Sequence, residues 1–126
     1  MGSIGHRKMI VWQNIDKLEA MVYTIILIKI PKNLFSLRDQ IERSLNSVGA
    51  NFVEGYYSGS LKEYIRFLGY SKRSLAELQD WIRRCWYKRL ISDKEYNDFD
   101  NLAIKTLYLL NRLIQALKQN LLSKPS

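Results

Sequence analysis

The sequence predicts an all-α protein, an antiparallel up-down-up-down four-helix bundle, and three observations support this fold class. Apolar residues recur at helical spacing in four successive segments of the 126-residue chain. No segment alternates apolar and polar residues with the period of a half-buried strand. Short connections between the segments favour antiparallel neighbours. We therefore expect a single domain over residues 1–126, with loose ends at residues 1–10 and 122–126.

The first helical segment is predicted from about Val11 to Ile30, where Pro31 ends it. Its second half, MVYTIILIKI, is apolar almost all round, and a buried strand is the alternative for such a β-branched run. The helical spacing that continues from Trp12 favours a helix buried on more than one side. Because Lys29 interrupts the run well short of the roughly 20 residues of a membrane span, we expect no membrane partner. We interpret the surplus apolar surface as a sign of oligomerisation.

The second segment is predicted to begin at FSLRDQ, where Ser36 caps the helix and Asp39 follows three residues later. Its apolar stripe consists of Leu37, Ile41, Leu45, Val48 and Phe52. The small residues Gly49 and Ala50 allow two helices to approach closely. The segment ends in NFVEGYYSGS, where Gly55 can adopt the left-handed conformation that terminates a helix.

The third and fourth segments open with capping boxes, in which a serine hydroxyl accepts from a glutamate amide and the glutamate carboxylate reaches back. The first box pairs Ser60 with Glu63, and the second pairs Ser92 with Glu95. The third segment then runs to about Lys88, and the fourth continues to the C-terminal end. Both starts are therefore well defined.

The composition favours an acidic partner. Twenty Lys and Arg against twelve Asp and Glu give a net charge of +8, and nucleic acid is the commonest partner of so basic a protein. A basic surface kept only for solubility is the alternative. The single Cys85 excludes an internal disulfide and fits a cytoplasmic protein. Arg83 and Arg84 can lower its pKa, but its spacing from Leu78 and Ile82 favours a small core residue.

Enzymatic and metal sites find little support in the sequence. Because His6 is the only histidine, cysteine and histidine cannot assemble a zinc site. No Ser-His-Asp set or phosphate-binding glycine loop can be found, so we predict no enzyme, metal, cofactor or small-molecule substrate. Asn51 and Glu54 lie on one face of the second segment. Metal binding or base catalysis is one interpretation of this pair, and a polar link between the second and third helices is the one we favour.

The order VWQ, then QIERSLNSVGANFVEGYYSGSLKEYIRFLGYSKRSLAEL, resembles the 23S rRNA-intervening-sequence proteins, small bacterial four-helix bundles. The positions that match the family pattern are Asn51, Glu54, Gly55, Ser60, Glu63, Arg66, Phe67, Leu68, Ser74, Leu75 and Glu77. We expect a structural role for seven of them, namely Asn51, Glu54, Gly55, Ser60, Glu63, Ser74 and Glu77. The arginine common after the glycine turn is absent. The resemblance extends to the accessory variability determinant proteins of diversity-generating retroelements, basic pentamers that work with a reverse transcriptase and its template RNA.

The basic charge is concentrated in one region. Residues 60–91 carry a net charge of +5, whereas residues 34–56 carry −1. The predicted nucleic-acid-binding residues of this region are Lys62, Arg66, Lys72, Arg73, Arg83, Arg84, Lys88 and Arg89. At 100° per residue, four of them form a stripe opposite the apolar side, namely Lys62, Arg66, Arg73 and Arg84. Such a stripe suits phosphate contact, and a solvated helix face interleaved with Glu77 and Asp80 is the alternative.

Aromatic residues accompany the stripe. Tyr56, Tyr57, Tyr70 and Trp81 are candidates for base stacking. Phe67, Tyr70 and Trp81 share an apolar flank between core and stripe, and we expect a subunit interface there.

The sequence therefore predicts a non-catalytic, oligomeric, basic accessory protein that binds nucleic acid, with RNA or an RNA/DNA hybrid favoured. The family resemblance implies a ring of five subunits, a homopentamer, and a reverse transcriptase as partner. The alternative is a structural interaction module that docks an acidic protein surface and has no direct role with nucleic acid.

Overall fold

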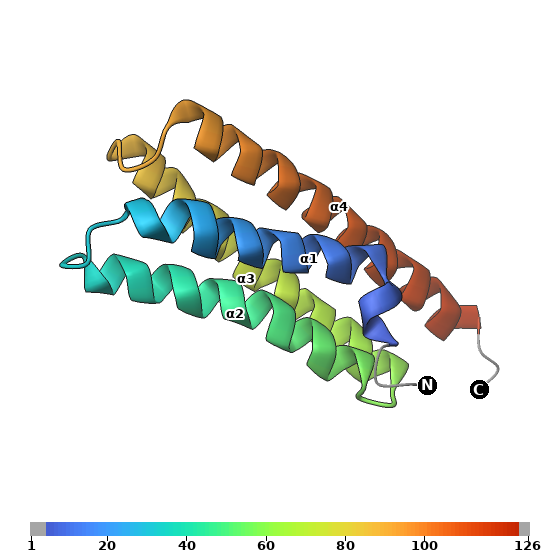
Figure 1. Ribbon diagram of the computed structural model, residues 1–126. Helices are drawn as coiled ribbons and strands as arrows, with labels where there is room; N and C mark the ends of the chain where they lie inside the picture. Colours follow the sequence, from blue (N-terminus) through green and yellow to red (C-terminus); the bar gives the residue numbers. More distant parts are fainter. Residues whose placement is uncertain (1–4, 124–126) are drawn as a thin grey trace.

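Four long helices pack as a bundle, and successive helices run in opposite directions (Figure 1). The computed structural model describes residues 5–123. The helices are α1 (Ile10–Met21), α2 (Phe35–Tyr56), α3 (Leu61–Tyr87) and α4 (Asp93–Ser123). α2 packs against α3, α3 against α4, and α1 against both α2 and α4. The predicted all-α four-helix bundle is confirmed.

The first helical segment is less regular than predicted. A π-helical turn, Val22–Ile26, follows α1, and a 3-10 turn, Leu27–Lys29, comes before Pro31. Thr24 Oγ1 donates to the carbonyl oxygen of Ala20 at 2.6 Å, and such back-bonding often bends helices. The segment buries Val22, Ile26, Leu27 and Ile30 and exposes Tyr23, Ile25 and Ile28. Within a single subunit, the segment thus buries one face and exposes three large apolar side chains, so the burial on more than one side that we expected is not seen there.

α2 does not begin at a serine cap. Its N-cap is Leu34, without a side-chain hydrogen bond, and Ser36 lies inside the first turn. The connection before it is fixed from within α2 instead, because Arg38 Nη1 donates to the carbonyl oxygens of Leu27 and Ile30 at 2.6 and 2.9 Å. The guanidinium thus binds two carbonyl oxygens at the end of the preceding helical segment, and that of Leu27 also accepts from the Ile30 amide at 3.2 Å. The predicted Ser36 cap was wrong.

Gly55 does not terminate α2 in a left-handed conformation. The helix continues to Tyr56, and Gly59 is the residue that adopts a positive φ of 79°. Gly55 is needed for a different reason. A Cβ atom on it would lie 2.8 Å from the Cβ of Phe67 and 3.2 Å from the carbonyl oxygen of Tyr64. The missing side chain therefore lets α2 and α3 approach closely at their joint.

The two predicted helix starts are confirmed, and one capping box is complete. At α4, the Ser92 hydroxyl accepts from the Glu95 amide at 3.1 Å, and the Ser92 amide donates to the Glu95 carboxylate at 2.7 Å. At α3, the Ser60 hydroxyl accepts from the Glu63 amide at 3.3 Å. The return bond is missing from the described chain, because the Glu63 carboxylate accepts from Arg66 instead.

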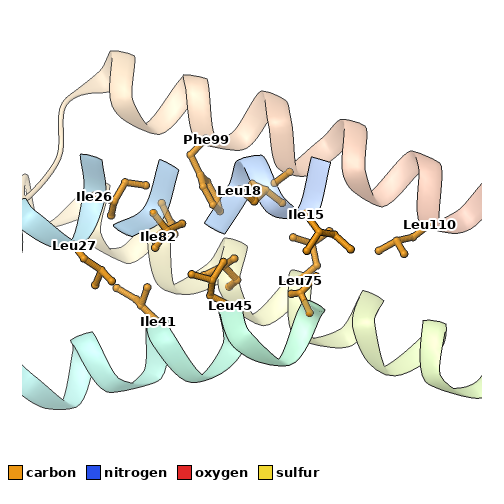
Figure 2. Packing of buried hydrophobic residues seen from close by; sticks show 14 of the residues in the cluster. Ile15, Leu18, Ile26, Leu27, Ile41, Leu45, Leu75, Ile82, Phe99 and Leu110 are labelled. Atoms are coloured by element: carbon orange, nitrogen blue, oxygen red, sulfur yellow. The ribbon is translucent and has the colours of Figure 1, made fainter. Parts of the chain in front are cut away.

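The core runs along the axis of the bundle and draws on all four helices. Figure 2 shows Leu18 of α1 and Phe99 of α4 facing Leu45 of α2 and Leu75 of α3, all of them nearly inaccessible to solvent. Cys85 lies in the same cluster, and its burial raises the pKa of its thiol to about 11. The prediction that Cys85 is a small core residue is confirmed. No helix in residues 5–123 has the length and hydropathy of a membrane span.

Candidate nucleic-acid interface

α3 separates an apolar face from a basic one, as its sequence predicts. Leu68, Leu75 and Ile82 are fully buried, whereas the Arg66 and Arg84 side chains keep about half of their surface exposed, 54% and 52%. Of the eight predicted nucleic-acid-binding residues, six more surround these two along the helix and the turn after it. The exposed ones are Lys62, Arg73, Lys88 and Arg89, and the partly buried ones are Lys72 and Arg83.

Three of the eight cations form ion pairs. Arg66 pairs with Glu63 at 2.5 Å, while Asp80 accepts from Arg83 at 2.9 Å and from Arg84 at 3.0 Å. The hydrogen bond from Arg83 lowers the pKa of the Asp80 carboxyl most, and the hydrogen bond from Arg84 lowers it further. The other five form no ion pair within the described chain, namely Lys62, Lys72, Arg73, Lys88 and Arg89. The acidic residues that interrupt the stripe therefore neutralise only part of it.

Guanidinium groups also lie over aromatic rings along α3. The Arg73 guanidinium is 5.6 Å from the centre of the Tyr70 ring, and that of Arg84 is 4.8 Å from the centre of the Trp81 ring. Arg66 lies over both Phe67 and Tyr70, at 5.2 and 5.7 Å. Such contacts attract the cation to the ring face and limit the positions it adopts. The arginines are thereby held in place while their outer edges face solvent.

The predicted subunit flank lies along the seam between α2 and α3. Phe67, Tyr70 and Trp81 are half-buried, and Phe67 packs where Gly55 allows α2 to come close. Trp81 packs against the core cluster and lines a hollow with the first turn of α2. Much of this apolar surface is therefore used within the subunit. A role for the three rings in subunit contact stays a prediction.

The link between α2 and α3 runs through serines that the sequence reasoning missed. Asn51 Nδ2 donates to the Ser47 carbonyl oxygen and hydroxyl at 2.8 and 3.0 Å, and the Ser74 hydroxyl donates to that of Ser47 at 3.0 Å. The buried Ser71 hydroxyl donates to the Val48 carbonyl oxygen at 2.6 Å. Glu54 is exposed and makes no hydrogen bond within the described chain. The helical spacing of two serine pairs, Ser44 with Ser47 and Ser71 with Ser74, was the available signal.

Three family-motif residues meet around one shallow hollow on this seam. Asn51 comes from α2, and Ser74 and Glu77 come from α3. Tyr70 and Arg73 complete the wall together with Ser47. The hollow is polar and open, and it lies beside the basic stripe.

Aromatic residues close the end of the bundle where α2 passes into α3. His6 is buried there, and its Nδ1 lies 2.9 Å from the hydroxyl of Tyr57. The Trp12 and Tyr56 rings meet His6 edge-on, and burial raises the pKa of Tyr64 to about 12. His6 thus packs on the bundle, although it lies within the stretch 1–10 that we expected to be loose. Residues 1–4 and 124–126 lie outside the described part of the chain.

Nothing in the described chain resembles a metal centre. Within residues 5–123, no group of three or more His, Cys, Asp or Glu side chains is placed so that it could hold a metal ion. The exposed face of α3 offers ionic and aromatic contacts.

The comparisons with known proteins agree with the fold. The sequence matches the family described as 23S rRNA-intervening sequence protein over residues 7–112. The structure is similar to the crystal structure of a protein with unknown function from the S23 ribosomal protein family of Bacteroides thetaiotaomicron, with a TM-score of 0.76. The alignment covers 83% of this chain and 98% of the other at 21% identity, a likeness that supports the fold alone. No match was found among curated proteins.

Proposed function

This chain belongs to the 23S rRNA-intervening sequence protein family, and from that premise we propose that it is a non-catalytic, basic protein that binds nucleic acid, with RNA favoured. One observation carries the proposal. Five of the eight cations on α3 and the turn after it have no carboxylate partner within the described chain. With 27 residues, α3 is about 40 Å long, so cations along it can reach several phosphates of one strand.

Phosphate contact suits these side chains better than base reading. Lysine and arginine neutralise phosphates and release counterions, whatever the sequence of the nucleic acid. The paired arginines contribute less than the unpaired cations, because the carboxylate of Glu63 or Asp80 already offsets part of their charge. We therefore expect Lys62 and Arg73 to contribute more per residue than Arg66 and Arg84.

The test is a variant in which Lys62, Arg66, Arg73 and Arg84 are all changed to Gln. We expect the slope of log K against log salt for single-stranded RNA to become shallower, by about 0.7 per lost phosphate contact. The helical signal and melting temperature should stay nearly unchanged, because all four side chains are exposed.

The matched control removes the same charge elsewhere, by changing Lys17, Lys32, Lys105 and Lys118 to Gln. These residues are exposed and lie outside α3. An equal loss of affinity in both variants would mean that net charge alone matters, and unchanged RNA binding by the α3 variant would overturn the proposal. Stronger binding to an acidic peptide than to RNA would favour the alternative role as a docking module for acidic proteins.

We also propose that the protein works as a homo-oligomer, for which the family resemblance suggests a ring of five. Support comes from Tyr23, Ile25 and Ile28, which expose 37%, 41% and 71% of their surface on one apolar segment. Sedimentation equilibrium should give a multiple of 14.9 kDa, and a mass near that of one subunit would contradict the proposal. Ile28→Glu is a better test than Trp81→Glu, because Trp81 packs against the core and its change would also destabilise the fold.

A reverse transcriptase is the partner that the resemblance suggests, and we propose that the protein presents RNA or an RNA/DNA hybrid to it. Genes beside this one should then encode a reverse transcriptase, and the two proteins should co-purify in an RNA-dependent manner. If they co-purify equally well after nuclease treatment, the contact is between the proteins themselves.

A further inference from the structure

The start of α2 and the end of α3 lie at the same end of the bundle (Figure 1). Residues of both helix ends line a hollow there. Its volume is about 460 Å³, within the range of small-ligand sites. Nine residues line it, namely Asn33, Leu34, Phe35, Ser36, Leu37, Gln40, Trp81, Arg84 and Lys88. The walls combine an apolar surface with uncharged polar groups and two charged residues.

Both charged residues of the hollow are cations. Lys88 forms no ion pair within the described chain. Arg84 binds Asp80 through Nε, so that its two terminal nitrogens make no hydrogen bond within that part of the chain. The hollow therefore favours an anionic ligand, and it continues the basic stripe of α3 because Arg84 belongs to both.

An exposed aromatic ring stands at the same place. Phe35 exposes 72% of its surface, although it is a large apolar side chain. The Trp81 ring, in contrast, is half-buried and covered by the Arg84 guanidinium. Phe35 therefore offers a free face on which a planar group can stack, and Trp81 forms part of the wall.

Polar side chains near Phe35 have hydrogen-bonding groups that can bind the edge of such a planar group. The Asn33 amide and the Ser36 hydroxyl make no hydrogen bond within the described chain, and Gln40 accepts one from Arg43 through its Oε1 while its amide nitrogen makes none. Unpaired bases are recognised in this way, by stacking on an aromatic ring and by hydrogen bonds to their exposed edges.

We propose that this hollow holds one unpaired nucleotide of a bound strand, with its base stacked on Phe35 and its phosphate between Arg84 and Lys88. The inference rests on the proposed nucleic-acid binding and makes it more specific. Bases of a duplex are stacked inside the helix and cannot enter. The protein therefore prefers single-stranded or looped RNA to a perfect duplex.

The experiment compares a ten-nucleotide single-stranded RNA of mixed sequence with the duplex that it forms with its complement. The wild-type protein is expected to bind the single strand more tightly. Phe35→Ala should weaken binding of the single strand about tenfold, the order of one lost stacking contact, and leave duplex binding unchanged. The salt slope should not change, because Phe35 carries no charge. Tyr108→Ala, which removes a ring of similar exposure from α4, serves as the control and should change neither affinity.

A second variant tests the phosphate contact. Lys88→Gln should weaken binding of the single strand and make its salt slope shallower by about 0.7, the value of one phosphate contact. If Phe35→Ala leaves the preference for the single strand intact, or weakens both RNAs equally, the nucleotide site is overturned while the basic stripe remains a candidate. If neither the Phe35 nor the Lys88 variant affects RNA but both weaken binding of a ten-residue poly-glutamate peptide, the hollow belongs to a protein partner. Circular dichroism confirms that each variant is folded.

Discussion

At the scale of single residues, we expect the same substitution to have opposite effects on stability at two glycines. Gly55 and Gly69 are both helical, but their surroundings differ. A Cβ at Gly55 would lie 2.8 Å from the Phe67 Cβ, whereas one at Gly69 would have no neighbour within 4 Å. The sequence alone gives no hint of this difference, since both glycines stand among apolar and aromatic residues.

We predict that Gly55→Ala destabilises the protein by about 1–3 kcal/mol, because α2 and α3 must separate to admit the methyl group. Gly69→Ala is the matched control and should stabilise by about 0.5–1 kcal/mol, since alanine restricts the unfolded chain more than glycine does. Urea unfolding measures both free energies. Equal effects of the two changes would show that the close approach at Gly55 costs nothing to relax.

A second residue-scale prediction concerns Cys85. Burial raises the pKa of its thiol to about 11, so only about one thiol in a thousand is ionised at pH 8. Because the thiolate is the reactive form and the side chain is fully buried, native protein should resist iodoacetamide for as long as it stays folded. Mass spectrometry should show rapid modification once urea is added. Fast modification of native protein would mean that the end of α3 opens locally.

At the scale of elements, the start of α4 is tied to the end of the first helical segment. The Glu95 carboxylate closes the capping box with Ser92 and also binds Lys29, 2.5 Å away at the end of the first helical segment. The capping box was predictable because it depends on four consecutive residues. The ion pair was not, because Lys29 and Glu95 lie far apart in the sequence and meet only in the folded chain.

We predict that Ser92→Ala costs about 1 kcal/mol of stability, as the loss of an N-cap does.

The pKa of the Glu95 carboxyl is held below its usual range, first by Lys29 and then by the Ser92 amide. The contribution of Glu95 to stability is therefore complete above its ordinary pKa and is lost as the pH falls through the lowered folded value. Thermal melts of wild type and Glu95→Gln should differ at pH 7 and converge in acid. A difference that persists unchanged in acid would contradict the ionic origin.

At the scale of the whole molecule, the sequence predicted what depends on local periodicity and missed what depends on contacts between distant residues. The number of helices, the Ser60 and Ser92 starts and the separation of core from basic stripe on α3 all follow from spacing along one segment. The Ser47–Ser74 bond and the burial of His6 arise only when helices meet. For the same reason, the hollow beside Phe35 was invisible, because its walls lie more than forty residues apart in the chain.

We predict that the protein unfolds in one cooperative transition. A single hydrophobic cluster includes residues of all four helices, so no helix retains a core of its own when another is lost. In urea, circular dichroism and tryptophan fluorescence should give coincident curves at a fixed protein concentration, since any assembly makes stability depend on concentration. Trp12 and Trp86 report on α1 and on the end of α3. An earlier change in fluorescence alone would show that one end of the bundle loosens first.

The π-helical turn after α1 also sets where the first hairpin closes. Its hydrogen bonds span five residues rather than four, so the turn behaves as an α-helix with one residue inserted. Deleting Thr24 would restore regular winding and rotate every later residue of that segment by about 100° relative to α1. The chain would then leave the helix at Pro31 in another direction. The two carbonyl oxygens that Arg38 binds would no longer lie beside its guanidinium. One residue of extra length thus fixes the path of the chain from the first helix to the second.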